Sequence, residues 1–106
     1  MLDLDCYFIK GVLIFKLKGT LNEKTSNILN NKVANLLNAC GFRNALFNLV
    51  ELNEIDRNGY NSLLFNCNKI KYSGGKALFF GIDKYKYNSK EFNVDNEINI
   101  LNNFNI

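Results

Sequence analysis

The sequence contains no histidine and no proline, and it has only three cysteines. Without histidine the chain lacks the commonest general base and metal ligand, and it cannot form a Ser-His or Cys-His dyad. The cysteines Cys6, Cys40 and Cys67 have spacings that fit no zinc or redox motif. Their odd number and the absence of a signal peptide favour a reducing cytoplasm, in which we expect Cys40 and Cys67 to be buried free thiols.

Long hydrophobic runs are absent as well. The longest apolar stretches span about six residues, which is too short to cross a membrane, so we expect no membrane insertion. The formal net charge is +3, and its excess lies mostly in lysines between residues 69 and 90. No aromatic or arginine pattern of a nucleic-acid module accompanies these lysines, so we interpret them as a solvated surface. A chain of 106 residues suffices for one domain, 1–106, with a single hydrophobic core.

The first half of the chain predicts a β-hairpin followed by a helix. Strands over residues 4–9 and 12–17 flank a tight turn at Lys10 and Gly11. Asn22 is a candidate N-cap for the helix, with Glu23 in its first turn, and Gly41 follows its end near residue 40. Apolar residues at helical spacing form one stripe: Leu29, Val33, Leu36, Leu37 and Cys40.

Residues 45–82 have the pattern of a βαβ unit. The apolar run over residues 45–50 is typical of an inner strand covered on both faces. A helix then begins near Arg57, with Asp56 as its candidate N-cap, and it ends before Gly74 and Gly75. A strand over residues 77–82 follows, parallel to the first if the crossover is right-handed. The buried stripe of this helix is predicted as Tyr60, Leu63, Leu64, Cys67 and Ile70.

Beyond Asp83 we predict a short helix over residues 85–92 and a last strand over residues 97–101. The expected fold is therefore α/β, with a mixed sheet of four or five strands and helices packed on it.

Four short motifs occur in a fixed order along this pattern. They read Gly19-Thr20-Leu21-Asn22, Leu46-Phe47-Asn48-Leu49, Ile55-Asp56-Arg57-Asn58-Gly59 and Gly74-Gly75-Lys76. In this order the chain resembles the STAS domain, the family of the bacterial anti-sigma factor antagonists. The motifs correspond to the family's G-E-L-D, its apolar strand ending in D/N-L, its I-D-S-S-G loop and its G-G turn, so the resemblance implies a STAS-like fold.

The loop departs from the family at its most important position. In the family the second serine of D-S-S-G is phosphorylated by the partner kinase, which is itself an anti-sigma factor. Asn58 stands at that position, Arg57 replaces the first serine, and the acidic residues of G-E-L-D become Thr20 and Asn22. An amide cannot accept a phosphoryl group and carries no charge. The resemblance therefore implies a domain without a phospho-acceptor, fixed in a binding-competent state that resembles the unphosphorylated one.

A helical projection of residues 57–72 places several residues opposite the apolar stripe. They are Asn58, Asn61, Ser62, Phe65, Lys69 and Tyr72. A phenylalanine among polar residues indicates either a partner surface or a contact with the C-terminal segment. We predict partner binding by Asp56, Arg57, Asn58, Gly59, Asn61, Ser62 and Phe65.

Nothing in the sequence predicts catalysis. No GxGxxG motif or P-loop follows a strand. Glu51, Glu54 and Asp56 lie close in sequence, but they are expected in a surface loop rather than in a metal site. We therefore expect neither a cofactor nor a nucleic-acid partner, and we predict a protein-binding regulatory module.

The resemblance implies an anti-sigma factor, a serine-kinase-like ATPase, as its partner. One alternative is a STAS subunit of a larger assembly, either a lipid-transport ABC complex with a transporter ATPase or a stress-signalling scaffold. Another is a sensor of a small ligand or nucleotide at the same helix start. A loop at Asn58 that has lost its function is the remaining alternative.

Overall fold

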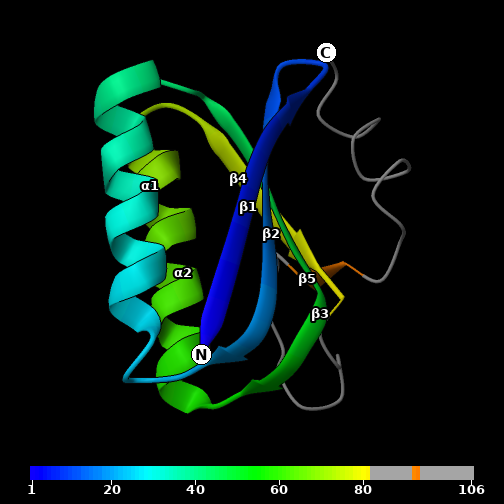
Figure 1. The fold of residues 1–106 in the computed structure, drawn as a ribbon. Coiled ribbons are helices and arrows are strands. Elements are labelled where there is room, and N and C mark those ends of the chain that lie inside the picture. Colours follow the sequence, from blue (N-terminus) through cyan, green and yellow to red (C-terminus); the bar gives the residue numbers. More distant parts are fainter. Residues whose placement is uncertain (82–91, 94–106) are drawn as a thin grey trace.

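One sheet and two helices make up the part of the chain that the computed structural model describes, residues 1–81 and 92–93. The strands are β1 (Leu2–Ile9), β2 (Val12–Leu21), β3 (Asn44–Ile55), β4 (Lys76–Phe80) and β5 (Phe92–Asn93). Their order in the sheet is the order in the chain, with β1 antiparallel to β2 and every other neighbouring pair parallel. Helices α1 (Ser26–Cys40) and α2 (Arg57–Tyr72) cover the same face of the sheet (Figure 1). This confirms the predicted α/β fold with a mixed sheet.

The opening hairpin forms as its sequence predicts. Ile9 pairs with Val12 across a two-residue turn, in which Lys10 has φ 51° and Gly11 has φ 81°. Positive φ at both central residues matches the right-handed twist of the two strands.

A row of phenylalanines crosses the helix-covered face of the sheet. Phe15 of β2 is in register with Phe47 of β3, which is in register with Phe79 of β4, and all three are fully buried. The rings of Phe15 and Phe47 stack with centroids 4.9 Å apart. Both helices close over this row with apolar side chains: Leu29 and Val33 from α1, and Leu63, Cys67 and Ile70 from α2.

The other face of β3 is buried too, as the apolar run predicts for an inner strand. Leu46 joins a second cluster with Val12, Ile14 and Phe80. The exception is Val50, which is 61% exposed. The register between β2 and β3 shifts here, because two residues of β3 stand opposite one residue of β2, and a β-bulge of this kind redirects the side chains that follow.

Several predictions about element ends and burial need correction. Helix α1 begins at Ser26, because residues 23–25 form a preceding turn and Thr25 occupies the N-cap position without a side-chain cap bond. Cys40 is exposed rather than buried, because it is the last residue of α1 and lies beyond the part packed on the sheet. Cys67 is buried as predicted.

The predictions for the C-terminal region are mostly not covered by the described residues. Phe92 belongs to β5, whereas the rest of the helix expected over residues 85–92 and the strand expected over residues 97–101 lie outside them. Within the described residues, no helix is long and apolar enough to cross a membrane.

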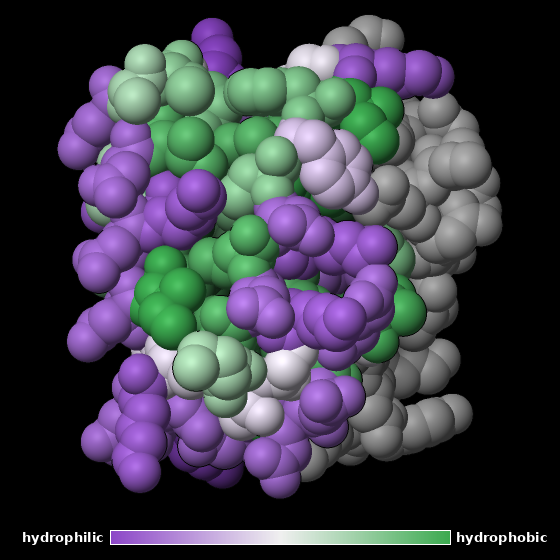
Figure 2. Space-filling view, viewed as in Figure 1, coloured by the Kyte–Doolittle hydropathy of each residue, from purple (hydrophilic) through white to green (hydrophobic). Residues whose placement is uncertain are grey.

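The face that carries α1 and β1 mixes hydrophobic and hydrophilic surface. Figure 2 shows hydrophobic side chains there in patches separated by hydrophilic ones. Exposed hydrophobic residues of these two elements include Tyr7, Phe8 and Ile28.

Candidate functional site

The carboxyl ends of β2 and β3 meet at one edge of the sheet because the two strands are parallel. Leu21 is in register with Ile55 there, and the Asp56 N–H donates to the Leu21 carbonyl oxygen at 3.3 Å. The sheet thus brings together the turn at residues 22–25 and the loop at residues 56–59. A ligand-binding position at the carboxyl ends of parallel strands is common in α/β proteins.

Gly59 lets the first turn of α2 rest directly on the end of β2. A Cβ atom at this position would overlap the carbonyl oxygen of Leu21. Gly59 is itself buried, although its three predecessors in the loop are exposed. The glycine of the loop motif is therefore explained by a close backbone contact, and a side chain there would push the loop off the sheet.

Asp56 caps α2, as predicted. It adopts an extended conformation before the helix, and its Oδ1 accepts a hydrogen bond from the Gly59 N–H at 2.8 Å. This bond satisfies one of the N–H groups that an α-helix leaves free at its start, and the carboxylate lies where the helix dipole favours negative charge.

A side-chain hydrogen bond joins the turn after β2 to the start of α2. Asn58 Nδ2 donates to Glu23 Oε1 at 3.4 Å, and both residues are exposed. Asn22 organises this turn, because its Oδ1 accepts from the N–H groups of Lys24 at 2.9 Å and of Thr25 at 3.1 Å. Asn22 therefore caps a turn that precedes α1, and the prediction that it is the N-cap of the helix was wrong, because Thr25 occupies that position.

Exposed side chains continue from Asn58 along the outer side of α2. Asn61, Phe65, Asn68 and Tyr72 follow Asn58 at helical spacing and are all exposed. Phe65 is 57% exposed and Tyr72 is 91% exposed. We call these five residues the outer stripe of α2. A shallow hollow of about 400 Å³ lies between the two aromatic side chains, lined also by Asn68, Lys69 and Ser73.

Ser62 does not belong to this surface, which corrects the predicted exposed side. It is 8% exposed and faces α1, where its Oγ donates to Asn30 Oδ1 at 2.9 Å. Asn66 Nδ2 donates to the same Asn30 oxygen at 2.7 Å and to the Ser62 carbonyl oxygen at 2.8 Å. The two helices therefore meet through a polar contact. A helical projection identifies the buried side from apolar residues alone, so it predicted that this polar side of α2 is exposed to solvent.

Of the predicted binding residues, Asp56, Arg57, Asn58, Asn61 and Phe65 are exposed along the start and first half of α2, whereas Gly59 is buried. Sequence reasoning missed the contribution of Glu23, which was expected inside a helix. The sequence did contain a signal for this contact, because asparagine favours turns and Asn22 follows β2. The carboxylate of Glu23, the next residue, then lies beside the loop that follows the parallel strand β3.

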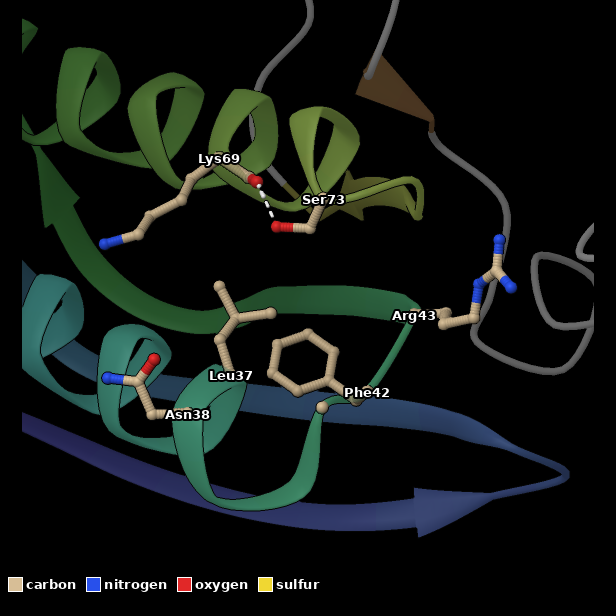
Figure 3. A pocket seen from close by; sticks show the side chains of 7 residues that line it. Leu37, Asn38, Phe42, Arg43, Lys69 and Ser73 are labelled. Atoms are coloured by element: carbon tan, nitrogen blue, oxygen red, sulfur yellow. Dashed lines mark hydrogen bonds between the residues drawn. The ribbon is translucent and has the colours of Figure 1, made fainter.

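A second hollow lies at the opposite end of the helices, near their carboxyl ends. It has a volume of about 540 Å³ and is lined by Leu37, Asn38, Gly41, Phe42, Arg43, Lys69 and Ser73. Figure 3 shows the side chains of Arg43 and Lys69 pointing away from each other. Arg43 Nη2 donates to the Gly74 carbonyl oxygen at 3.0 Å. The two cations therefore do not converge on one ligand position.

Glu51 and Cys6, which lie outside the site, have shifted pKa values. The hydrogen bond and the positive charge of Lys16 lower the pKa of Glu51, whose Oε2 lies 2.8 Å from Lys16 Nζ. Burial raises the pKa of the Cys6 thiol, against an opposing effect of Lys32. Within residues 1–81 and 92–93, no three histidine, cysteine or acidic residues are grouped so that they could hold a metal ion.

No family model and no curated protein matches the sequence. Solved structures do match the fold. The anti-sigma factor antagonist SpoIIAA in its unphosphorylated form aligns with a TM-score of 0.76 at 10% identity, over 95% of this chain and 96% of that one. Its phosphorylated form aligns with a TM-score of 0.73.

Two further structures agree. A putative anti-sigma factor antagonist from Thermotoga maritima aligns with a TM-score of 0.79 at 13% identity, over 97% of this chain and 95% of that one. The STAS domain of an antisigma-factor antagonist from Rhodobacter sphaeroides aligns with a TM-score of 0.61 at 12% identity, over 87% and 96%. At such low identity the likeness is one of fold, and the chain has a divergent STAS-like fold.

Proposed function

We propose that this chain is a non-enzymatic regulatory module that binds a protein partner through residues 56–59 and the outer stripe of α2. The observation that carries the proposal is the exposure of Phe65 on the same side of α2 as Asn58, with Tyr72 two turns further on. Exposed aromatic side chains within a polar rim are typical of the central contacts of protein interfaces. The STAS-like fold supports the same surface, because the loop at residues 56–59 corresponds to the family's regulatory loop.

The proposed partner is an anti-sigma factor of the serine-kinase-like ATPase class in the cytoplasm. Structures of SpoIIAA exist in an unphosphorylated and a phosphorylated form, so that protein carries the modification. Here Asn58 occupies the corresponding position and offers no hydroxyl group. Phosphorylation adds about two negative charges at such a site and changes every contact made there, so its loss leaves the complex without this means of release.

Co-purification from the native cell with a tagged chain tests the proposal. We expect one major protein partner with the wild-type chain and none with the Phe65→Glu variant, because a carboxylate cannot enter an apolar pocket of the partner without a large desolvation cost. Phe8→Glu is the matched control. Phe8 is 55% exposed, close to the 57% of Phe65, but it lies on β1. The control should retain the partner, and the melting temperatures of both variants should stay near that of the wild type.

The identity of the captured protein separates the alternatives. A kinase-like ATPase supports the proposal, whereas a transporter ATPase indicates a subunit of a larger assembly. Equal capture by wild-type and Phe65→Glu protein contradicts the proposed surface. A thermal shift with ATP, GTP or a lipid, together with no captured protein, favours a small-ligand sensor instead.

Restoring a hydroxyl group tests the proposed loss of phosphorylation. The Asn58→Ser variant should become a substrate of the captured kinase-like ATPase in the presence of ATP, and the wild-type chain should not. Intact-protein mass spectrometry reads this directly. Regulated phosphate on Ser62 of the wild-type chain would contradict the proposal, because this hydroxyl is buried against Asn30.

A further inference from the structure

The residue at the centre of the candidate site is followed by glycine. Asn58 is the only asparagine in the chain with glycine as its next residue. In such a pair the backbone nitrogen of the glycine can attack the side-chain carbonyl carbon of the asparagine, because glycine has no side chain to block the approach. An Asn-Gly pair is therefore the most reactive sequence for spontaneous loss of an asparagine amide.

The structure places the two reacting groups under opposite conditions. Asn58 is exposed, so water reaches its side chain. Gly59 is buried, and its N–H donates to Asp56 Oδ1 at 2.8 Å. The attacking nitrogen must lose its proton, and a neighbouring carboxylate opposes the negative charge that this creates. Both residues also belong to α2, whose backbone conformation keeps that nitrogen away from the Asn58 side-chain carbonyl carbon.

We propose that Asn58 is a site of spontaneous deamidation and that the Asp56 cap controls its rate. When the first turn of α2 opens, the Gly59 nitrogen bonds to Asn58 Cγ, the Cγ–Nδ2 bond breaks, and ammonia leaves with the proton from that nitrogen. Water then opens the cyclic imide at either carbonyl and gives aspartate or isoaspartate. No electrons are exchanged, and water is the only co-reactant.

The product changes the contact between the two loops of the site. Asn58 Nδ2 now donates to Glu23 Oε1 at 3.4 Å. After deamidation a carboxylate faces that carboxylate, so attraction becomes repulsion, while the start of α2 gains a negative charge that its dipole favours. Isoaspartate also lengthens the backbone within the first turn. The site thus acquires charge slowly, in one direction and without a kinase. The chemical change stands apart from the proposed function, whereas its effect on a partner rests on that function.

The experiment follows the purified chain during incubation at neutral and mildly alkaline pH. Peptide mass spectrometry measures conversion at Asn58, and enzymatic methylation of isoaspartate confirms the product. Wild-type protein is compared with Asp56→Ala and with wild-type protein unfolded in urea. We expect the unfolded chain to react fastest and Asp56→Ala to react about fivefold faster than the folded wild type, the factor that corresponds to a typical lost N-cap.

Two controls isolate the cap. Asn61, followed by Ser62 in the same helix, reports general opening of α2 and should change much less than Asn58. Asp56→Asn keeps an acceptor oxygen without the charge, so its rate should lie between those of the wild type and Asp56→Ala. Equal rates in the wild type and Asp56→Ala would overturn the proposed control, and so would equal rates in folded and unfolded wild-type protein. No conversion in the unfolded chain would overturn the site itself.

A separate measurement tests the consequence for binding. Asn58→Asp protein should capture less of the partner that the Phe65→Glu variant loses, and equal capture by Asn58→Asp and wild-type protein would overturn this part. The rate measurements need no partner, so they stand or fall independently of the proposed function.

Discussion

Replacing Gly59 by alanine sets two physical effects against each other at the base of the candidate site. Gly59 lies within α2, where alanine is favoured over glycine by about 1 kcal/mol. Helix propensity alone therefore predicts a more stable protein. The added Cβ atom would, however, overlap the carbonyl oxygen of Leu21, a backbone atom of β2 that cannot rotate away.

The steric overlap should outweigh the gain in helix propensity, so we expect Gly59→Ala to destabilise the protein. Overpacking of a closely packed contact costs about 1–3 kcal/mol, and relief by moving α2 would break the hydrogen bond from Asp56 N–H to Leu21 O, which contributes about 1 kcal/mol more. Against the propensity gain, the net loss should be roughly 2 kcal/mol in the free energy of unfolding. For a domain of this size that corresponds to a fall of roughly 10 °C in melting temperature.

Urea unfolding followed by circular dichroism measures this change, and thermal unfolding provides a second estimate. Asn61→Ala is the control for propensity, because Asn61 is exposed on the same helix and its replacement should stabilise the protein by roughly 0.5 kcal/mol. A Gly59→Ala protein as stable as the wild type would refute the close contact with Leu21. The loop at residues 56–59 would then lie elsewhere, and the geometry of the candidate site would fail with it.

Two further measurements test groups away from the loop. Cys40 should react with a thiol reagent in the folded protein, and Cys67 should react only after unfolding. Cys6 should react more slowly than Cys40, because burial raises the pKa of the Cys6 thiol and so reduces its thiolate fraction. Rapid labelling of Cys67 in the folded protein would contradict the described core. The pKa of Glu51, followed by NMR, should lie below its ordinary value of 4.5 and should return toward it in Lys16→Met. Because the pKa of Glu51 is lowered in the folded protein, the Lys16–Glu51 pair contributes to stability above pH 4.5, and this contribution is lost as the pH falls through the folded pKa. An unchanged titration of Glu51 in Lys16→Met would show that Lys16 does not cause the shift.

The βαβ unit was predictable because each of its parts has a strong local signal. The apolar run of β3, the capping position of Asp56 and the glycines after α2 each specify one element or boundary. The end of β3 was predicted wrongly, because the strand continues to Ile55 through Glu51 and Glu54, which were expected in a surface loop. The start of α1 was not predictable to the residue. Asn22 accepts backbone N–H groups in a turn that continues into the helix, so the capping signal and the first helical residue are separated.

The start of α2 at residues 56–59 and the exposure of Phe65 could be predicted from the sequence, but which other residues of α2 are exposed could not. Ser62 lies on the polar side of a hydrophobic projection, yet it is buried because Asn30 of α1 supplies a hydrogen-bond partner. A buried polar contact between two helices needs one residue from each, and no periodicity within either helix reveals it. The contact between Asn58 and Glu23 was missed for a different reason: the turn at Asn22 was predicted to be the first turn of a helix, which hid that Glu23 lies beside the loop at residues 56–59.

The order of the strands has a consequence for how the protein is made. Each strand pairs with the strand that precedes it in the chain, so the sheet grows from β1 toward β5 in the direction of synthesis. A nascent chain can close the hairpin first and then add one strand and its helix at a time, without waiting for a distant segment. Pairing between neighbours in sequence keeps the loop closed at each step as short as a parallel crossover allows, which limits the entropy cost of adding each strand.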